Sequence, residues 1–118
     1  MRPLAVHHVS IMVPDVEKAL RFYTEVLGLE QRADRPELGI GGAWLDAGGQ
    51  QLHLVEGEAP PGLGQHFALL IDDLDATVAE LRGRGLEVSD PRPIGRSLQS
   101  FVSDPSGNLV ELHQAVLA

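Results

Sequence analysis

The first half of the chain alternates between strand-like and helix-like hydrophobic patterns. Residues 6–13 form a β-branched, apolar run, which predicts a buried strand. Asp15 then stands where a helix N-cap is expected, and apolar residues recur at helical spacing as far as Gly28. Three further strands are predicted, a short one over residues 29–33 and a hairpin over residues 43–46 and 51–55.

The second half follows the same order. Residues 66–71 predict a strand, Asp73 an N-cap, and the apolar stripe after it a helix that ends near Gly83 and Gly85. Two strands, over residues 100–103 and 109–113, surround a turn at residues 104–108. Residues 56–64 are rich in Gly and Pro and predict a linker between the halves.

Overlaying the second half on the first, with His66 placed on His8, tests for an internal repeat. The same overlay superposes several further polar and glycine positions: Asp15 on Asp73, Asp46 on Asp104, Gly49 on Gly107 and His53 on Glu111. The matched residues above are 58 positions apart in the chain, whereas Gly28 and Gly85, near the end of each helix, are 57 apart. This difference indicates a deletion of one residue in the second helix connection. We interpret the chain as a duplicated unit.

The expected fold class is therefore α+β, with two βαβββ modules related by a pseudo-twofold repeat. One domain spans residues 1–118 and consists of a module at 1–58 and a module at 59–118. A chain of 118 residues is long enough to bury a core without disulfides or structural metals. Each half carries the same formal charge, as duplication predicts, because residues 1–58 have 5 basic and 9 acidic groups and residues 59–118 have 4 and 8.

Composition excludes several classes of partner and site. The formal net charge of −8, with no basic cluster, argues against nucleic acid as a partner. The absence of Cys excludes disulfides, Fe–S clusters and thiolate zinc sites. No segment has the run of about 20 apolar residues that a membrane span needs, and the N-terminus shows no signal-peptide pattern. We expect a cytoplasmic protein with no membrane partner.

The repeat places four side chains that commonly bind metals at equivalent positions: His8 and His66 on the first strands, His53 and Glu111 on the last. If a pseudo-twofold axis relates the halves, all four can converge on one ion. Three imidazoles and one carboxylate suit a divalent zinc, nickel, iron, manganese or cobalt ion and suit calcium poorly.

Structural roles compete with this interpretation, because a single strand His is more often a hydrogen-bonded core or surface residue than a ligand. The agreement with the repeat favours ligands at His8, His66 and Glu111, whereas His53 is either a ligand or an acid/base group. His7 is expected on the face opposite His8. His113 shares the face of Glu111 and is either solvated or part of a substrate rim.

The chain resembles the vicinal oxygen chelate superfamily, which includes glyoxalase I, extradiol dioxygenases, methylmalonyl-CoA epimerase, fosfomycin resistance transferases and bleomycin resistance proteins. The residues of this chain that resemble the opening signature of the superfamily are His8–Ile11, Asp15, Phe22–Tyr23 and Leu27–Gly28. Residues 104–112 resemble its closing signature. The resemblance extends from about Leu4 to Gln114. It implies paired βαβββ modules forming a cup-shaped mixed sheet around a metal, and commonly a homodimer. It also implies ligands at His8, His53, His66 and Glu111.

The resemblance implies that a divalent metal binds two neighbouring oxygens of a small-molecule substrate and stabilises an enediolate or oxyanion. It implies catalytic roles for His53 and Glu111, in a glyoxalase-like lyase or isomerase or an extradiol-type dioxygenase. Glyoxalase I often has Glu where this chain has His53, and residues 92–102 lack the Lys, Ser and Tyr contacts of the fosfomycin enzymes. Dioxygenases of this kind are commonly larger than this chain.

Two classes of function remain after these comparisons of motifs. One is a metalloenzyme acting on an oxygen-rich small molecule, and the other is a binding protein that sequesters an antibiotic or metabolite without catalysis. A thiol transferase resembling the fosfomycin enzymes is a further alternative. Residue type and position select four candidate substrate contacts: Trp44, Arg96, Phe101 and His113. The substrate, the native metal, and whether modules pair within a chain or between subunits are left open.

Overall fold

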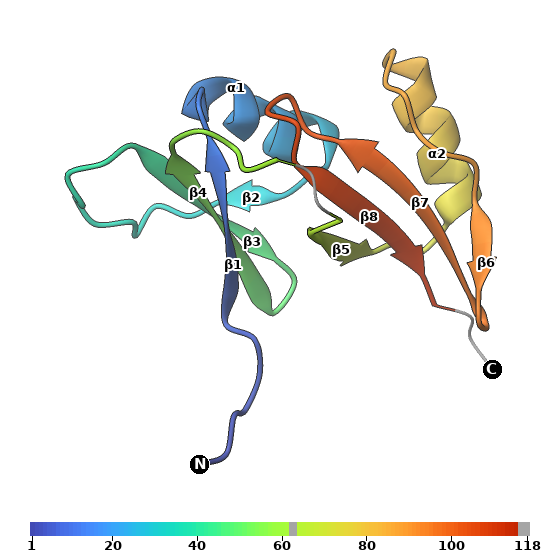
Figure 1. The fold of residues 1–118 in the computed structure, drawn as a ribbon, viewed down its shortest axis with the longest axis horizontal. Helices are drawn as coiled ribbons and strands as arrows, with labels where there is room; N and C mark the ends of the chain where they lie inside the picture. Colours follow the sequence, from blue (N-terminus) through green and yellow to red (C-terminus); the bar gives the residue numbers. More distant parts are fainter. Residues whose placement is uncertain (62–63, 116–118) are drawn as a thin grey trace. The chain divides into compact units, whose positions relative to one another are not determined.

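Each half of the chain forms its own four-stranded mixed sheet with a helix between its first and second strands (Figure 1). The computed structural model describes residues 1–61 and 64–115. The chain divides into two compact units, a first module at Met1–Pro61 and a second module at Gly62–Ala118. The predicted α+β fold with two βαβββ modules is confirmed. No helix among the described residues is long and apolar enough to cross a membrane.

The first module contains five conventional elements and one π-helical segment. They are β1 (His8–Val13), α1 (Val16–Arg21), η1 (Phe22–Val26), β2 (Glu30–Gln31), β3 (Gly42–Ala47) and β4 (Gln50–Glu56). The sheet order is β1-β4-β3-β2, so the first strand lies directly beside the last.

The second module repeats this arrangement. It contains β5 (His66–Leu70), α2 (Leu74–Gly83), β6 (Arg92–Ile94), β7 (Ser97–Ser103) and β8 (Leu109–Gln114). The sheet order is β5-β8-β7-β6. In both modules the first and last strands are parallel and the remaining pairs are antiparallel.

An aspartate caps the helix of each module, as the sequence predicts. The Asp15 carboxylate accepts a hydrogen bond from the backbone N–H of Lys18 at 3.1 Å, and Asp73 accepts one from Ala76 at 3.1 Å. These bonds satisfy N–H groups that have no partner within the helix. Gly85, at φ +85°, follows α2 in a left-handed conformation that favours glycine.

The first helix differs from the single α-helix expected up to Gly28. After Arg21 the backbone widens into the π-helical segment η1, where the N–H of Leu27 bonds the carbonyl of Phe22, five residues earlier. Phe22 and Tyr23 are both buried in this segment. A π-helical turn contains more residues than an α-helical turn, so it changes which residues point toward the core. Two consecutive aromatic rings can therefore both face the core.

The core of each module occupies one face of its sheet. On β4, Leu52 and Leu54 are 2% and 1% exposed, and on β8, Val110 and Leu112 are fully buried. The α2 side chains that pack in the second module are Leu74, Val78 and Leu81. Because strand side chains alternate between faces, the residues between these apolar positions face the other side of the sheet. That other side carries the candidate ligands.

The third strands show an offset that the overlay of the two halves missed. Trp44 lies opposite His53, and Phe101 lies opposite Glu111. Trp44 and Phe101 are therefore structurally equivalent, although the overlay that superposes His53 on Glu111 would place Trp44 on Val102. Each module thus places an aromatic residue beside its last-strand candidate ligand.

The offset arises because the turn of the second hairpin is one residue longer than the turn of the first. This difference corrects the match of Asp46 to Asp104. In the first hairpin Ala47 pairs with Gln50, whereas in the second the N–H of Asp104 bonds the carbonyl of Asn108. The second connection is one residue longer, so the register makes Ala47 the equivalent of Asp104. The structure also adds β6, which was not predicted, because a three-residue strand containing a proline gives no periodic signal.

Asp104 organises the longer hairpin through a buried carboxylate. It accepts hydrogen bonds from the backbone N–H groups of Ser106 and Asn108, at 2.8 and 2.7 Å, and from the Asn108 side-chain amide at 3.0 Å. The residue is only 5% exposed. Its removal would leave several donors without an acceptor in a place that water reaches poorly.

We therefore predict that Asp104→Ala lowers the free energy of unfolding by about 2–3 kcal/mol, because hydrogen bonds to a charged group are each worth about 1.5–3 kcal/mol. Urea unfolding monitored by circular dichroism measures the change. The helix-cap variant Asp73→Ala serves as a control, with an expected loss of about 1 kcal/mol. Equal losses in the two variants would contradict the special role of Asp104.

Candidate functional site

The first module stacks three aromatic rings on the face opposite its core. The imidazoles of His8 and His53 are 4.0 Å apart between centroids, with an angle of 14° between their planes. The indole of Trp44 lies on the other side of His53, at 4.5 Å and 9°. This stack arises because β1 and β3 both pair with β4, so their side chains on this face are neighbours of His53.

Polar groups hold two of these rings. The Nε2 of His53 lies 2.9 Å from the side-chain oxygen of Gln51, so this nitrogen donates and Nδ1 carries the lone pair. The Nδ1 of His8 lies 3.0 Å from Nδ1 of His7, where one ring donates and the other accepts. The expectation that His7 lies on the opposite face from His8 is wrong. The His7 ring instead lies against the ring of His8, with centroids 5.2 Å apart and planes at 87°.

Burial lowers the pKa of His53, and the nearby imidazoles of His8 and His7 lower it further. His53 is 8% exposed, and its charged form would lose most of its hydration. The lowered pKa favours the neutral form of the ring. A neutral imidazole is the form that binds a metal or accepts a proton.

The second module joins its two candidate ligands directly. His66 Nε2 lies 3.0 Å from Oε1 of Glu111. The other ring nitrogen of His66, Nδ1, donates to the carbonyl of Gly64 at 2.9 Å. The bond to the Gly64 carbonyl, together with that to Glu111, raises the pKa of His66, because both acceptors favour the protonated ring.

Two further side chains complete this half of the site. Phe101 places its ring against His66, with centroids 5.4 Å apart and planes at 84°. His113 Nδ1 donates to the second carboxylate oxygen of Glu111, Oε2, at 2.9 Å. The Glu111 side chain is 12% exposed and is engaged at both oxygens.

These donor sets fit the divalent metal that the sequence predicts. Imidazole nitrogen and carboxylate oxygen are common ligands of such ions, and His66 Nε2 and Glu111 Oε1 lie 3.0 Å apart. Metal-binding histidines typically donate their other ring N–H to a carbonyl or carboxylate, as His66 does to Gly64. In the first module, binding through Nε2 of His53 would replace its hydrogen bond to Gln51.

Each module by itself brings together one pair of candidate ligands. Taken separately, the described parts of the two modules contain no group of three or more His, Cys, Asp or Glu side chains that could hold a metal ion. The predicted four-ligand site therefore stays a prediction, whose two halves the structure describes as His8 with His53 and His66 with Glu111.

Three of the four candidate substrate contacts lie beside a pair of candidate metal ligands, and the fourth does not. Trp44 lies against His53, Phe101 against His66, and His113 against Glu111. Arg96 instead lies exposed in the turn between β6 and β7. Gln51 was missed as a site residue, although strand alternation already places it on the face of His53.

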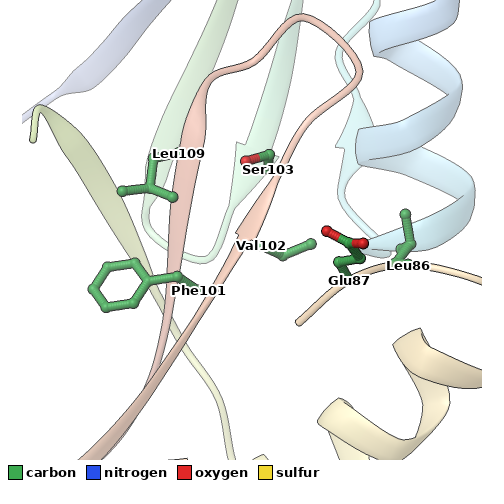
Figure 2. Close-up of a pocket in the computed structure, with 6 residues that line it drawn as sticks. All are labelled: Leu86, Glu87, Phe101, Val102, Ser103 and Leu109. Atoms are coloured by element: carbon green, nitrogen blue, oxygen red, sulfur yellow. The ribbon is translucent and has the colours of Figure 1, made fainter. Parts of the chain in front are cut away.

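A pocket of about 190 Å³ adjoins Phe101 in the second module (Figure 2). Its lining residues are Leu86, Glu87, Phe101, Val102, Ser103 and Leu109. Figure 2 shows Phe101 and Leu109 pointing to the same side of the sheet. Phe101 therefore borders both this pocket and the ring of His66.

The comparison with protein families decides the classification of this fold. The model of the Glyoxalase/Bleomycin resistance protein/Dioxygenase superfamily matches residues 5–112. The chain belongs to this superfamily. The resemblance inferred from the opening and closing motifs is confirmed, and the match includes all four candidate metal ligands.

Curated relatives within the superfamily are enzymes by name. The chain is 32% identical to the chloroplastic "Probable lactoylglutathione lyase" of Arabidopsis thaliana over 89% of this chain and 34% of that protein, so it spans about a third of that relative's length. It is 30% identical to the mitochondrial methylmalonyl-CoA epimerase of Bos taurus, over 92% of this chain and 73% of the epimerase. These relatives support an enzyme-like member of the superfamily.

Solved structures of superfamily members include both a glyoxalase-like protein and a binding protein. A glyoxalase family protein from Bacillus anthracis is 30% identical, with a TM-score of 0.88 over 98% of this chain and 100% of that one. TnmS3, an antibiotic binding protein from Streptomyces sp. CB03234, is 32% identical, with a TM-score of 0.80 over 98% and 99% of the two chains. The superfamily fold thus leaves both classes of function open.

The stack on His53 leads to a testable prediction for the metal-free protein. Trp44→Ala removes one of the two rings that cover His53, and we expect the pKa of His53 to rise toward its ordinary value because burial is the main cause of its depression. NMR titration of the histidine rings, with a chelator present, measures it. Trp44→Phe keeps an aromatic ring and should retain the depressed pKa; an unchanged value in Trp44→Ala would refute the role of the stack.

Proposed function

We propose that this superfamily member is a metal-dependent enzyme acting on a small molecule that presents two neighbouring oxygen atoms. One observation carries the proposal: in each module the first strand places a histidine beside a candidate ligand on the last strand. The pairs are His8 with His53 and His66 with Glu111. Both pairs lie on the face of the sheet opposite the apolar core, although His53 and Glu111 are themselves buried.

The four side chains would hold one divalent ion of the zinc, nickel, iron, manganese or cobalt group, since the set is nitrogen and oxygen without sulfur. When bound, such an ion supplies positive charge that stabilises negative charge developing on adjacent substrate oxygens. Donor chemistry does not select among these metals.

The surrounding side chains provide orientation and proton transfer. His53 and Glu111 are the proposed catalytic groups, because an imidazole nitrogen and a carboxylate oxygen are each able to accept and return a proton. Trp44 and Phe101 offer flat apolar surfaces beside the two ligand pairs and are proposed to bound the substrate. Arg96 is proposed as a more distant contact for an anionic group.

Among reactions, the relatives favour proton transfer next to a carbonyl. The two curated relatives described above are named as a lyase and an epimerase. A neutral, buried imidazole at His53 suits the same chemistry. An extradiol-type dioxygenase is the alternative reaction, and it would use the same ligand set with molecular oxygen.

Antibiotic or metabolite binding without catalysis is the second candidate function. It is favoured by the 32% identity to TnmS3 over nearly the whole of both chains. A binding protein would use the Trp44 and Phe101 surfaces and would not require the His and Glu pairs to hold metal. Metal content therefore distinguishes the two candidates.

We predict that protein purified without chelators contains one divalent ion per chain, measured by inductively coupled plasma mass spectrometry. His8→Ala, His66→Ala and Glu111→Ala should each become substoichiometric, because each removes one ligand. Ser10→Ala is the matched control, since Ser10 lies opposite His53 on the same face without joining the ring stack. His53→Ala decides whether His53 is a ligand, with loss of metal, or an acid/base group, with metal retained.

A metal-free wild-type chain would contradict the enzyme proposal and favour the binding protein. The lone tryptophan gives a second measurement, because Trp44 stacks directly on His53. Addition of nickel or cobalt should quench its fluorescence saturably in the wild type. Unchanged emission at a metal concentration that saturates the protein would argue against His53 as a ligand.

We predict that the metal-loaded protein isomerises 2-oxoaldehyde–thiol adducts without consuming oxygen, as followed by ultraviolet absorbance and an oxygen electrode. With metal content matched to the wild type, Glu111→Gln should lower kcat by about 10²–10⁴-fold, the range expected when a positioned proton-transfer group is lost. Catechols tested in the same panel provide the opposing outcome, since oxygen uptake with them would assign the dioxygenase reaction instead.

A further inference from the structure

Glu111 is held at both of its carboxylate oxygens. Oε1 lies 3.0 Å from Nε2 of His66, and Oε2 accepts a hydrogen bond from Nδ1 of His113 at 2.9 Å. His113 follows Glu111 by two residues on β8, so both side chains project from the same face of the sheet. The contact between them is local to one strand and needs no movement of the backbone.

The repeat does not account for this contact. When Glu111 is superposed on His53, the equivalent of His113 is Val55, which cannot donate a hydrogen bond to His53. His53 is instead held from the other side, by Gln51, whose own equivalent is the apolar Leu109. Each last-strand ligand therefore has its own polar neighbour, two residues before it in one module and two residues after it in the other.

A carboxylate at the end of a glutamate side chain rotates readily, because its terminal torsion has a broad profile. A hydrogen bond to Oε2 restricts that rotation and fixes the direction of Oε1. The charged acceptor also makes this bond stronger than one between neutral groups. With Oε2 occupied by His113, Oε1 remains directed at the nitrogen of His66.

We propose that His113 is a positioning residue that orients the Glu111 carboxylate for metal binding through its Nδ1–H. This inference rests on the proposed function, because it assigns His113 a role toward the ion held by Glu111. It replaces the substrate-contact role predicted from the sequence. His113 acts through Glu111 and is not itself a ligand or a catalytic group.

The test compares the metal affinity of two His113 variants by competition with a chromophoric chelator, using cobalt or zinc as the probe. His113→Leu removes the donor, and we expect affinity to fall about 10- to 100-fold, as is typical when a hydrogen-bond partner of a metal ligand is lost. His113→Asn places its amide nitrogen the same number of bonds from Cα as Nδ1 and should restore most of the affinity.

Gln99→Leu is the matched control, because Gln99 lies directly opposite His113 on β7 and takes no part in the described bonds to Glu111. It should bind metal as the wild type does. Thermal unfolding of every variant checks that the fold is retained. The visible spectrum of the cobalt form gives a second measurement, since a misdirected carboxylate changes the coordination of the ion.

Several outcomes would overturn the inference. Wild-type affinity in His113→Leu would show that the bond does not position Glu111. Equal losses in His113→Leu and His113→Asn, or in Gln99→Leu, would show a general effect of altering this surface. A wild-type chain without stoichiometric metal would overturn both this inference and the proposed function. Affinity lost in Glu111→Ala but unchanged in His113→Leu would overturn the inference alone.

Discussion

The parallel pairing of the first and last strand in each module is the constraint on which the candidate site depends. It places Ser10 beside His53 and Ala68 beside Glu111, so the histidine two residues earlier on each first strand lies next to the last-strand ligand. Residues 45 positions apart in the chain thereby come into direct contact. The helix between the first and second strands makes this possible, since parallel neighbours require a long crossover connection.

In each sheet, one face forms the apolar core and the other carries the candidate ligands. The two faces have opposite requirements, because one packs leucine and valine against the helix and the other must present polar atoms. On the polar face, each buried group is matched to a partner: His53 to Gln51, and Glu111 to His66 and His113. Unsatisfied groups there would cost about 1–3 kcal/mol each. Hydrogen bonding thus fixes the positions of His53, His66 and Glu111 among the candidate ligands.

Membership of the superfamily explains the scaffold better than it explains the reaction. The members compared with this chain share its fold and carry names as different as lyase, epimerase and antibiotic binding protein. Functions of this kind depend on a few side chains placed on a common framework. In this chain three side chains beside the candidate ligands differ between the two modules: Trp44, Gln51 and His113.

Local chemistry made the helix starts and the repeat predictable. Asp15 and Asp73 act as caps because a side-chain oxygen bonds an N–H three residues later, which sequence neighbours alone decide. Strand alternation likewise identified the face that carries His53 and Glu111. The π-helical segment was not predictable, since it depends on how Phe22 and Tyr23 pack together into the core.

The sequence by itself determined the two βαβββ modules, the core face of each sheet and the identity of four candidate ligands. These follow from periodicity and from equivalence between the halves. Only the tertiary structure decided the one-residue offset of the third strands, the stack of His8, His53 and Trp44, and the bond from His113 to Glu111. The physical reason is that strand register and side-chain rotamers are set by contacts across the sheet, which no local pattern records.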